Sequence, residues 1–237
     1  MYYNLMKTSS ENMNINFDKA HYEKFERYMR ILQKWNEKIN LTSIIEDKEI
    51  IQKHFIDSIK IFEFEEMENM EKIIDVGTGA GFPGIPIKIV KPEIKLTLLD
   101  SLNKRVKFLK EVGNELGLEN IEYIHGRAED FGNDNNYREQ YDLATSRAVA
   151  NMTVLSEYCL PFVKVGGYFI ALKGPSVEDE LRESEIALEK LGGRIKEIIE
   201  VDIEESDLKH NLVIVEKVSK TPANLPRRTV SIRKKPL

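Results

Sequence analysis

The stretch that decides the fold is DVGTGAGFPGIP, residues 75–86, which overlaps the end of the short apolar run KIIDV (72–76) and leads into a further apolar segment. Glycines allow the main chain to turn sharply with positive φ and to lie directly against a ligand. The free amides at the start of a following helix attract an anion. In an open parallel sheet such a loop lies at the carboxyl ends of the strands, where ligands bind. We therefore expect a nucleotide-like cofactor at this loop.

Short apolar runs alternate with helical patterns on the carboxyl side of this loop, which predicts a parallel, doubly wound sheet with right-handed crossovers. The predicted strands are residues 72–76, 95–100, 121–125, 141–145 and 167–172, and the predicted helices are residues 85–90, 102–116, 151–163 and 177–191. No helical pattern separates residues 194–201 from residues 211–218. These last two segments are therefore expected to pair antiparallel at one edge of the sheet.

The amino-terminal part has a different pattern. Apolar residues recur every three or four positions between residues 18 and 40 and again between residues 50 and 62, which indicates amphipathic helices. The first residues are polar. We therefore divide the chain into a flexible tail (1–16), a helical extension (17–71), a cofactor-binding domain (72–218) and a basic tail (219–237).

Composition restricts the class of protein. The chain has 237 residues, of which 41% are hydrophobic, and its single cysteine rules out an internal disulfide and a multi-cysteine zinc site. No apolar stretch reaches the length of a membrane span, so we expect a cytoplasmic protein without a membrane or metal partner. The net charge is −5, yet residues 219–237 contain six cations and no acid. This asymmetry predicts a basic surface on an acidic body.

The glycine pattern allows more than one cofactor. Gly79, Gly81 and Gly84 match the dinucleotide fingerprint, but the match alone is weak. An acid before alternating glycines, followed by two prolines, is more typical of enzymes that bind S-adenosylmethionine, since Asp75 could meet the ligand ammonium. Asp100 ends the next predicted strand and could accept the ribose hydroxyls, or it could cap the helix that follows.

These motifs resemble the RsmG family, also called glucose-inhibited division protein B, whose members are bacterial enzymes that methylate N7 of a guanine in 16S ribosomal RNA. The resemblance runs from about Tyr22 to Leu237. It is carried by the segments WNEKINLTSI (35–44), HFIDS (54–58), DVGTGAGFPGIPIKI (75–89), LLDSLNKRVKFL (98–109), GRAED (126–130), SRAVA (146–150), ALKG (171–174) and LPRRTVSIRKKPL (225–237).

The resemblance implies an α/β fold: a Rossmann-like class I S-adenosylmethionine-dependent methyltransferase with a seven-stranded, mostly parallel sheet, an antiparallel edge hairpin and an amino-terminal helical extension. With the reading of the residues above, the expected cofactor contacts are Asp75, Gly77, Gly79, Phe82, Asp100, Ala128, Glu129 and Arg147. Two other interpretations stay open: Glu129 as a solvated helix residue, and Arg147 as the partner of a structural carboxylate.

The implied reaction is an in-line methyl displacement. Guanine N7 has a free lone pair, so no general base is required, and Arg147 and Lys173 are candidates only for positioning the base. We expect a monomer whose partner is 16S ribosomal RNA or the small-subunit particle. The candidate RNA contacts are the cations Lys104, Arg105, Arg127, Arg227, Arg228, Arg233, Lys234 and Lys235.

Two other functions remain compatible with the residues themselves. One is a small-molecule methyltransferase with the same core, and the other is a protein that binds a dinucleotide at the glycine loop. His54 and Asp57 are three residues apart in the predicted helix between residues 50 and 62, and we expect a structural hydrogen bond between them.

Overall fold

A computed structural model describes residues 2–147 and 150–237. Its centre is a seven-stranded sheet with the strand order β3-β2-β1-β4-β5-β7-β6. The first five strands pair in parallel, β7 pairs antiparallel with β5, and β6 pairs antiparallel with β7. This confirms the predicted mostly parallel sheet with an antiparallel hairpin at one edge. The strands are β1 (Lys72–Val76), β2 (Lys95–Asp100), β3 (Ile121–His125), β4 (Tyr141–Arg147), β5 (Val163–Lys173), β6 (Gly193–Asp202) and β7 (Lys209–Lys217).

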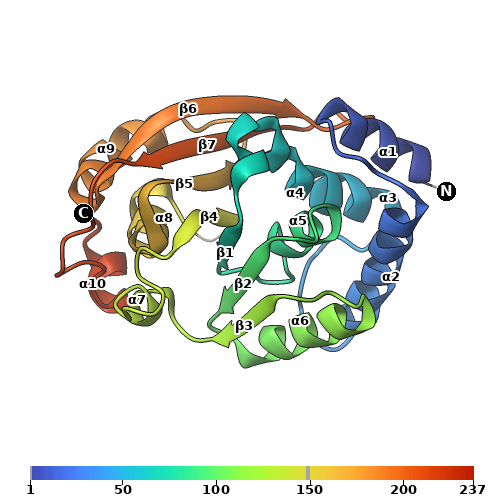
Figure 1. Cartoon of the computed structure of the whole chain (residues 1–237), viewed down its shortest axis with the longest axis horizontal. Coiled ribbons are helices and arrows are strands. Elements are labelled where there is room, and N and C mark those ends of the chain that lie inside the picture. The colour runs from blue at the N-terminus through green and yellow to red at the C-terminus, as the bar shows by residue number, and fades with distance from the viewer. Residues whose placement is uncertain (1, 148–149) are drawn as a thin grey trace.

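Helices cover both faces of the sheet (Figure 1). On one side lie the amino-terminal elements with α5 (Gly84–Val90) and α6 (Asn103–Glu115). The other side carries α7 (Ala128–Phe131), α8 (Met152–Cys159), the 3-10 helix η4 (Leu160–Phe162), α9 (Glu178–Leu191) and α10 (Thr229–Lys234).

Neighbouring residues of each central strand belong to opposite cores. Ile73 packs in the first core and Ile74 in the second, and Leu98 and Leu99 divide in the same way. Because side chains alternate across a strand, a strand covered on both faces needs apolar residues at every position. This is why the predicted strands appear as continuous apolar runs.

The helical extension begins with α1 (Tyr3–Asn12) and α2 (Lys19–Asn36). Asp18 caps α2 by accepting a hydrogen bond from the main-chain amide of His21, and the buried stripe of α2 is Phe25, Tyr28, Met29 and Leu32. Four short helical segments then follow one another directly: α3 (Asp47–Ile50), η1 (Ile51–Ile56), α4 (Asp57–Ile59) and η2 (Lys60–Glu63). The extended residue Phe64 separates them from η3 (Glu65–Asn69).

The expected flexible tail over residues 1–16 is wrong for the segment that forms α1. Leu5 and Met6 are buried in the first core, and Ser9 and Ser10 are also buried. The apolar residues of this segment are few, and contacts with distant parts of the chain hold it in place. Within the described residues, no helix is long and apolar enough to cross a membrane.

Candidate active site

The loop between β1 and α5 takes a shape that only glycine adopts without strain. Gly77, Gly79 and Gly81 have φ values of +71°, +61° and +93°. A Cβ on Gly81 would lie 2.7 Å from the Tyr28 hydroxyl, so α2 of the extension packs directly against the loop. The sequence of the loop therefore fixes its conformation and its contact with the extension.

Asp75 lies beneath this loop and is fully buried. Its Oδ2 accepts hydrogen bonds from the Thr78 hydroxyl at 2.6 Å and from the Gly84 amide at 2.9 Å. Its Oδ1 has no partner among the described residues, and burial raises the pKa of Asp75 to about 6. Asp75 thus holds the loop from below, and its contact with a ligand ammonium stays a prediction.

A cleft opens on the other side of the loop, over the carboxyl ends of β1, β2 and β3. We name it the glycine-loop cleft. Of the predicted cofactor residues, it brings together Gly77, Asp100, Ala128 and Glu129. Gly79 and Phe82 do not line it. Its lining also includes Val76, Leu99, Ser101, Gly126, Arg127, Tyr158, Thr229 and Arg233.

Asp100 connects the loop to the next helix. Its Oδ2 accepts a hydrogen bond from the Gly79 amide at 2.9 Å, and its Oδ1 accepts one from the Leu102 amide at 2.8 Å. Asp100 does not cap this helix: Leu102 is the residue before α6, and no side chain among the described residues accepts from the first amides of α6. Each carboxylate oxygen accepts more than one hydrogen bond, so these contacts leave Asp100 able to accept from a ligand as well.

A second cavity, of about 410 Å³, lies beside the glycine loop. We name it the Arg147 cavity. It is formed by η1, by the ends of β4 and β5 and by the start of β7, so the extension and the sheet both contribute to it. Both positioning candidates, Arg147 and Lys173, line it.

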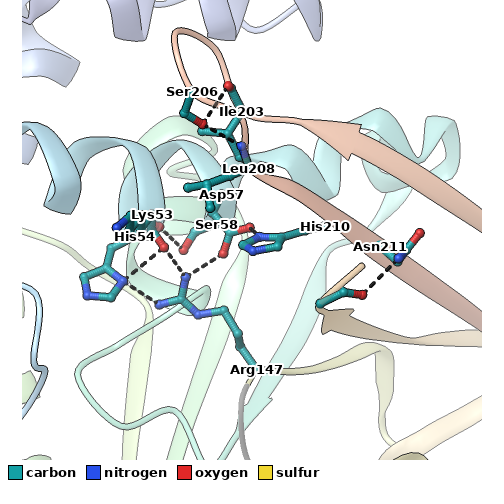
Figure 2. Close-up of polar contacts among 11 residues, drawn as sticks. Lys53, His54, Asp57, Ser58, Arg147, Ile203, Ser206, Leu208, His210 and Asn211 are labelled. Atoms are coloured by element: carbon teal, nitrogen blue, oxygen red, sulfur yellow. Dashed lines mark hydrogen bonds and ion pairs between the residues drawn. The ribbon is translucent and has the colours of Figure 1, made fainter. Parts of the chain in front are cut away.

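Arg147 is held in this cavity by groups from the extension (Figure 2). Its guanidinium donates to Asp57 Oδ2 at 2.6 Å and to the Lys53 carbonyl at 2.9 Å, and it lies 3.2 Å from Nδ1 of His54. It also lies over the ring of Phe82, 4.9 Å from the centroid. The alternative in which Arg147 pairs with a structural carboxylate is thus correct, and that carboxylate faces a cavity.

The ionisable neighbours of Arg147 have pKa values shifted from their ordinary values. Burial raises the pKa of Asp57, but the hydrogen bond from His210 and the charge of Arg147 outweigh burial and hold this pKa below its usual value. The hydrogen bond to Asp57, at 2.5 Å, raises the pKa of His210. Burial and the charge of Arg147 lower the pKa of His54 to about 4. At neutral pH, His54 is therefore neutral and can accept from Arg147.

Residue types alone did not reveal this cluster. The expected hydrogen bond between His54 and Asp57 is not what joins them: both contact Arg147 instead. His210 lies 153 residues from Asp57 in the sequence, and only the position of β7 beside β5 brings it near. Two residues of the SRAVA segment that follows Arg147, Ala148 and Val149, lie outside the described part of the chain.

Lys173, at the end of β5, is the second cation of the cavity. Its ammonium donates to Glu180 at 2.6 Å and to the carbonyl of Ala150 at 2.8 Å. These contacts fix the Lys173 side chain beside the segment that follows β4.

Three of the predicted RNA-contacting cations have a side-chain partner within the protein. Arg105 pairs with Asp100, Arg127 donates to the hydroxyl of Thr229, and Arg227 pairs with Glu157. The remaining members are exposed: Lys104, Arg228, Arg233, Lys234 and Lys235.

Comparison with known proteins decides the family of the chain. The model of the GidB family, described as rRNA small subunit methyltransferase G, matches residues 21–211. The chain belongs to the GidB family. Proteins named ribosomal RNA small subunit methyltransferase G from Clostridium tetani and Clostridium beijerinckii are 56% and 57% identical to it over 236 residues, covering 100% of this chain and 99% of each relative.

The fold agrees with membership of the GidB family. The solved structure of a precorrin-6y C5,15-methyltransferase from Geobacter metallireducens matches with a TM-score of 0.50 and 13% identity, over 68% of this chain and 87% of that one. This likeness concerns the fold alone. The resemblance drawn from the sequence is thus confirmed: the protein is a methyltransferase, and its methyl donor is S-adenosylmethionine.

The glycine-loop cleft has the chemistry to hold this donor in a GidB-family enzyme. Its lining combines an open main chain at Gly77, the apolar side chains of Leu99 and Ala128, and the nearly buried carboxylates of Asp100 and Glu129. Carboxylates accept hydrogen bonds from hydroxyl and amino groups, which an adenosine carries. Asp100 would hold the ribose, and the residues at Ala128 and Glu129 would face the adenine.

Proposed function

We propose that the protein transfers a methyl group from S-adenosylmethionine to N7 of a guanine in 16S ribosomal RNA. The observation that supports this proposal is the Arg147 cavity, which lies beside the glycine loop and carries the cations Arg147 and Lys173. Phe82 of the glycine loop stacks on His54, with ring centroids 4.5 Å apart, and so joins the loop to this cavity. In this proposal the glycine-loop cleft holds the methyl donor, and the Arg147 cavity receives the base.

The charges of the cavity favour guanine over adenine. Arg147 and Lys173 are hydrogen-bond donors without acceptor capacity. Guanine presents an acceptor, O6, beside N7, whereas adenine presents an amino donor there. Donors in the cavity therefore favour guanine in an orientation that places O6, and with it the neighbouring N7, on the side of the cations.

The ionisable side chains of the cavity suit a reaction without a general base. The bound cofactor supplies an activated methyl group on a sulfonium centre. N7 of neutral guanine already has a lone pair, so the protein has no proton to remove before attack. The Asp57 carboxylate is engaged by Arg147 and His210, and the His54 imidazole by Arg147 and Thr42. In this proposal these side chains orient the guanine ring, and orientation of the reactants alone lowers a reaction barrier by up to roughly 7–11 kcal/mol in favourable cases.

Exposed cations supply the contacts to RNA in this proposal. Lys104, Arg228, Lys234 and Lys235 lie at the surface and would bind phosphates, which position an RNA without reading its sequence. Binding should therefore weaken steeply with added salt. A ribosomal substrate also agrees with the cytoplasmic location expected from the sequence.

The test is to methylate RNA that lacks the acceptor atom. Unmodified 16S RNA and small-subunit particles are incubated with the enzyme and labelled S-adenosylmethionine, and the label is mapped by chemical strand scission at N7-methylated guanine. A matched 16S transcript is made with 7-deazaguanosine, in which a carbon replaces N7. We expect label on one guanine of the normal RNA or particle and none on the 7-deaza transcript. Equal labelling of both transcripts, or label on another base, would overturn the proposal.

A further inference from the structure

The carboxyl-terminal residues, expected from the sequence to form a basic tail, are docked onto the domain. We name residues 225–235 the C-terminal clamp. Leu225 and Ile232 are buried, the latter completely, in the second core. The helix of the clamp, α10, packs against α8 and lies beside α7 (Figure 1).

An ion pair anchors the clamp. The carboxylate of Glu157 in α8 is fully buried and accepts three hydrogen bonds from Arg227: from the main-chain amide at 2.8 Å, from Nε at 2.9 Å and from Nη2 at 2.6 Å. A bidentate guanidinium with a third bond from its own amide fixes both the position and the direction of the chain.

Two further side chains hold main-chain carbonyls at the start of the clamp. Arg138 donates to the carbonyls of Leu225, Thr221 and Pro222, and Asn133 donates to the carbonyl of Pro226. Both side chains come from the segment after α7, which follows the predicted adenine-contacting residues. The clamp is thereby tied to the same part of the chain that forms one wall of the glycine-loop cleft.

The anchors place two clamp residues in that cleft. Thr229 and Arg233 line it together with Asp100, Ala128 and Glu129. The Thr229 hydroxyl accepts a hydrogen bond from Arg127, which lies directly before α7. Arg233 has neither a hydrogen bond nor an ion pair among residues 2–147 and 150–237, so its planar guanidinium is available to a ligand.

We infer that Thr229 and Arg233 form the outer wall of the cofactor site and bind the adenosine end of S-adenosylmethionine. A guanidinium packs well on the face of an aromatic ring, and a threonine hydroxyl both donates and accepts hydrogen bonds. The inference depends on the identity of the methyl donor and is independent of the acceptor base. It also assigns Arg233 to the cofactor, whereas the sequence had suggested RNA.

Calorimetric titration with S-adenosylhomocysteine and with adenosine tests the inference without any turnover. The variants are Arg233→Ala and Arg233→Lys, and the matched control is Lys234→Ala, which removes an exposed cation from the same helix outside the cleft. We expect Arg233→Ala to weaken binding of both probes about 3- to 30-fold, the range given by losing a cation–π contact. Arg233→Lys should give an intermediate loss, and Lys234→Ala should bind as the wild type does.

Two outcomes would overturn the inference. One is wild-type affinity for both probes in Arg233→Ala, with Asp100→Ala weakened in the same assay to show that the assay detects a lost contact. The other is an equal loss in Lys234→Ala, which would indicate a general effect of charge. Thermal unfolding without ligand shows whether each variant is folded, and hydrogen exchange gives a second readout: S-adenosylhomocysteine should slow exchange of the clamp amides in the wild type and less so in Arg233→Ala.

Discussion

The carboxylate of Asp57 and the guanidinium of Arg147 lie 2.6 Å apart, although 90 residues separate them in the sequence. Both side chains are largely shielded from solvent, and His210 binds the second oxygen of the same carboxylate. This contact joins the helical extension to the carboxyl end of β4. It makes the position of Arg147 depend on a residue outside the methyltransferase core.

Asp57→Asn should loosen Arg147 without disturbing the cofactor site. Removing one partner of a buried ion pair costs about 3–5 kcal/mol of unfolding free energy, and an isosteric amide retains part of the hydrogen bonding, so we expect about 3 kcal/mol. Denaturant unfolding measures the loss, and methylation at saturating cofactor should slow while S-adenosylhomocysteine binds as before. Asp179→Asn is the control, because Asp179 pairs with Arg182 at the surface, where an ion pair contributes under about 1 kcal/mol.

His54 should make the protein less stable as the pH falls. Its pKa is about 4 in the folded protein and 6.5 ordinarily, so the unfolded chain takes up the proton first. The stabilisation is complete above pH 6.5 and is lost as the pH falls towards 4, in total roughly 3 kcal/mol. His54→Asn should flatten the pH dependence of unfolding in this window. A titration midpoint of His54 near 6.5, measured by NMR, would contradict the prediction.

His210 should have the opposite effect. Its hydrogen bond to Asp57 raises its pKa in the folded protein, so the folded chain holds the proton more tightly than the unfolded chain. The stabilisation is complete below pH 6.5 and is lost as the pH rises through the folded-state pKa. His210→Asn should therefore reduce the fall in stability above pH 6.5. The check is unfolding at a series of pH values, with unchanged pH dependence counting against the assignment.

Asp100→Ala should weaken S-adenosylhomocysteine binding by roughly 1–3 kcal/mol, the scale for a lost hydrogen bond to a charged group. Part of the effect comes from the loop, since Asp100 also accepts the hydrogen bond of the Gly79 amide. Glu93→Ala removes an exposed acid before β2, at the other end of that strand, and should leave the affinity unchanged. Unaltered binding in Asp100→Ala would remove Asp100 from the cofactor site.

Lys173→Met should reduce kcat/KM for RNA about 10- to 100-fold, the range given by losing a charged hydrogen bond to the acceptor base. The affinity for S-adenosylhomocysteine should not change. Lys164→Met serves as control, because Lys164 is at the other end of β5 and pairs with Asp142 at 2.5 Å. A similar rate loss in both variants would point to a general effect on β5.

Arg227→Met should destabilise the protein far more than Arg228→Met. The first change leaves the fully buried Glu157 carboxylate without its cation, at a cost of about 3–5 kcal/mol. The second removes an exposed neighbour with no ion pair in the described part of the chain. The difference in Tm between the two variants measures the contribution of the ion pair, and equal values of Tm would show that it contributes little.

The sequence located the sheet well because its strands are covered on both faces. A strand such as KLTLLD (95–100), with its run of buried residues, can be predicted without information from distant residues. The glycine loop is explained by the φ values within the loop itself. The helix α1 was missed because it has few apolar residues and depends on packing against other elements.

The composition of the Arg147 cavity could not be predicted, because it depends on contacts between distant segments. His210 comes to the cavity only through the antiparallel return of β7, and no local pattern marks it. In the same way, the charge of Arg227 suggested a surface role, whereas its partner Glu157 lies in the middle of an apolar helix and is 70 residues away.

The Arg147 cavity takes one wall from the extension and the other from the sheet, whereas the glycine-loop cleft is lined by the sheet domain and the C-terminal clamp. If the Arg147 cavity receives the base as proposed, the acceptor site is shared between residues 17–71 and the sheet, whereas none of residues 17–71 lines the donor cleft. Substitutions at Lys53, His54 or Asp57 would then reshape the acceptor site and leave the lining of the donor cleft unchanged.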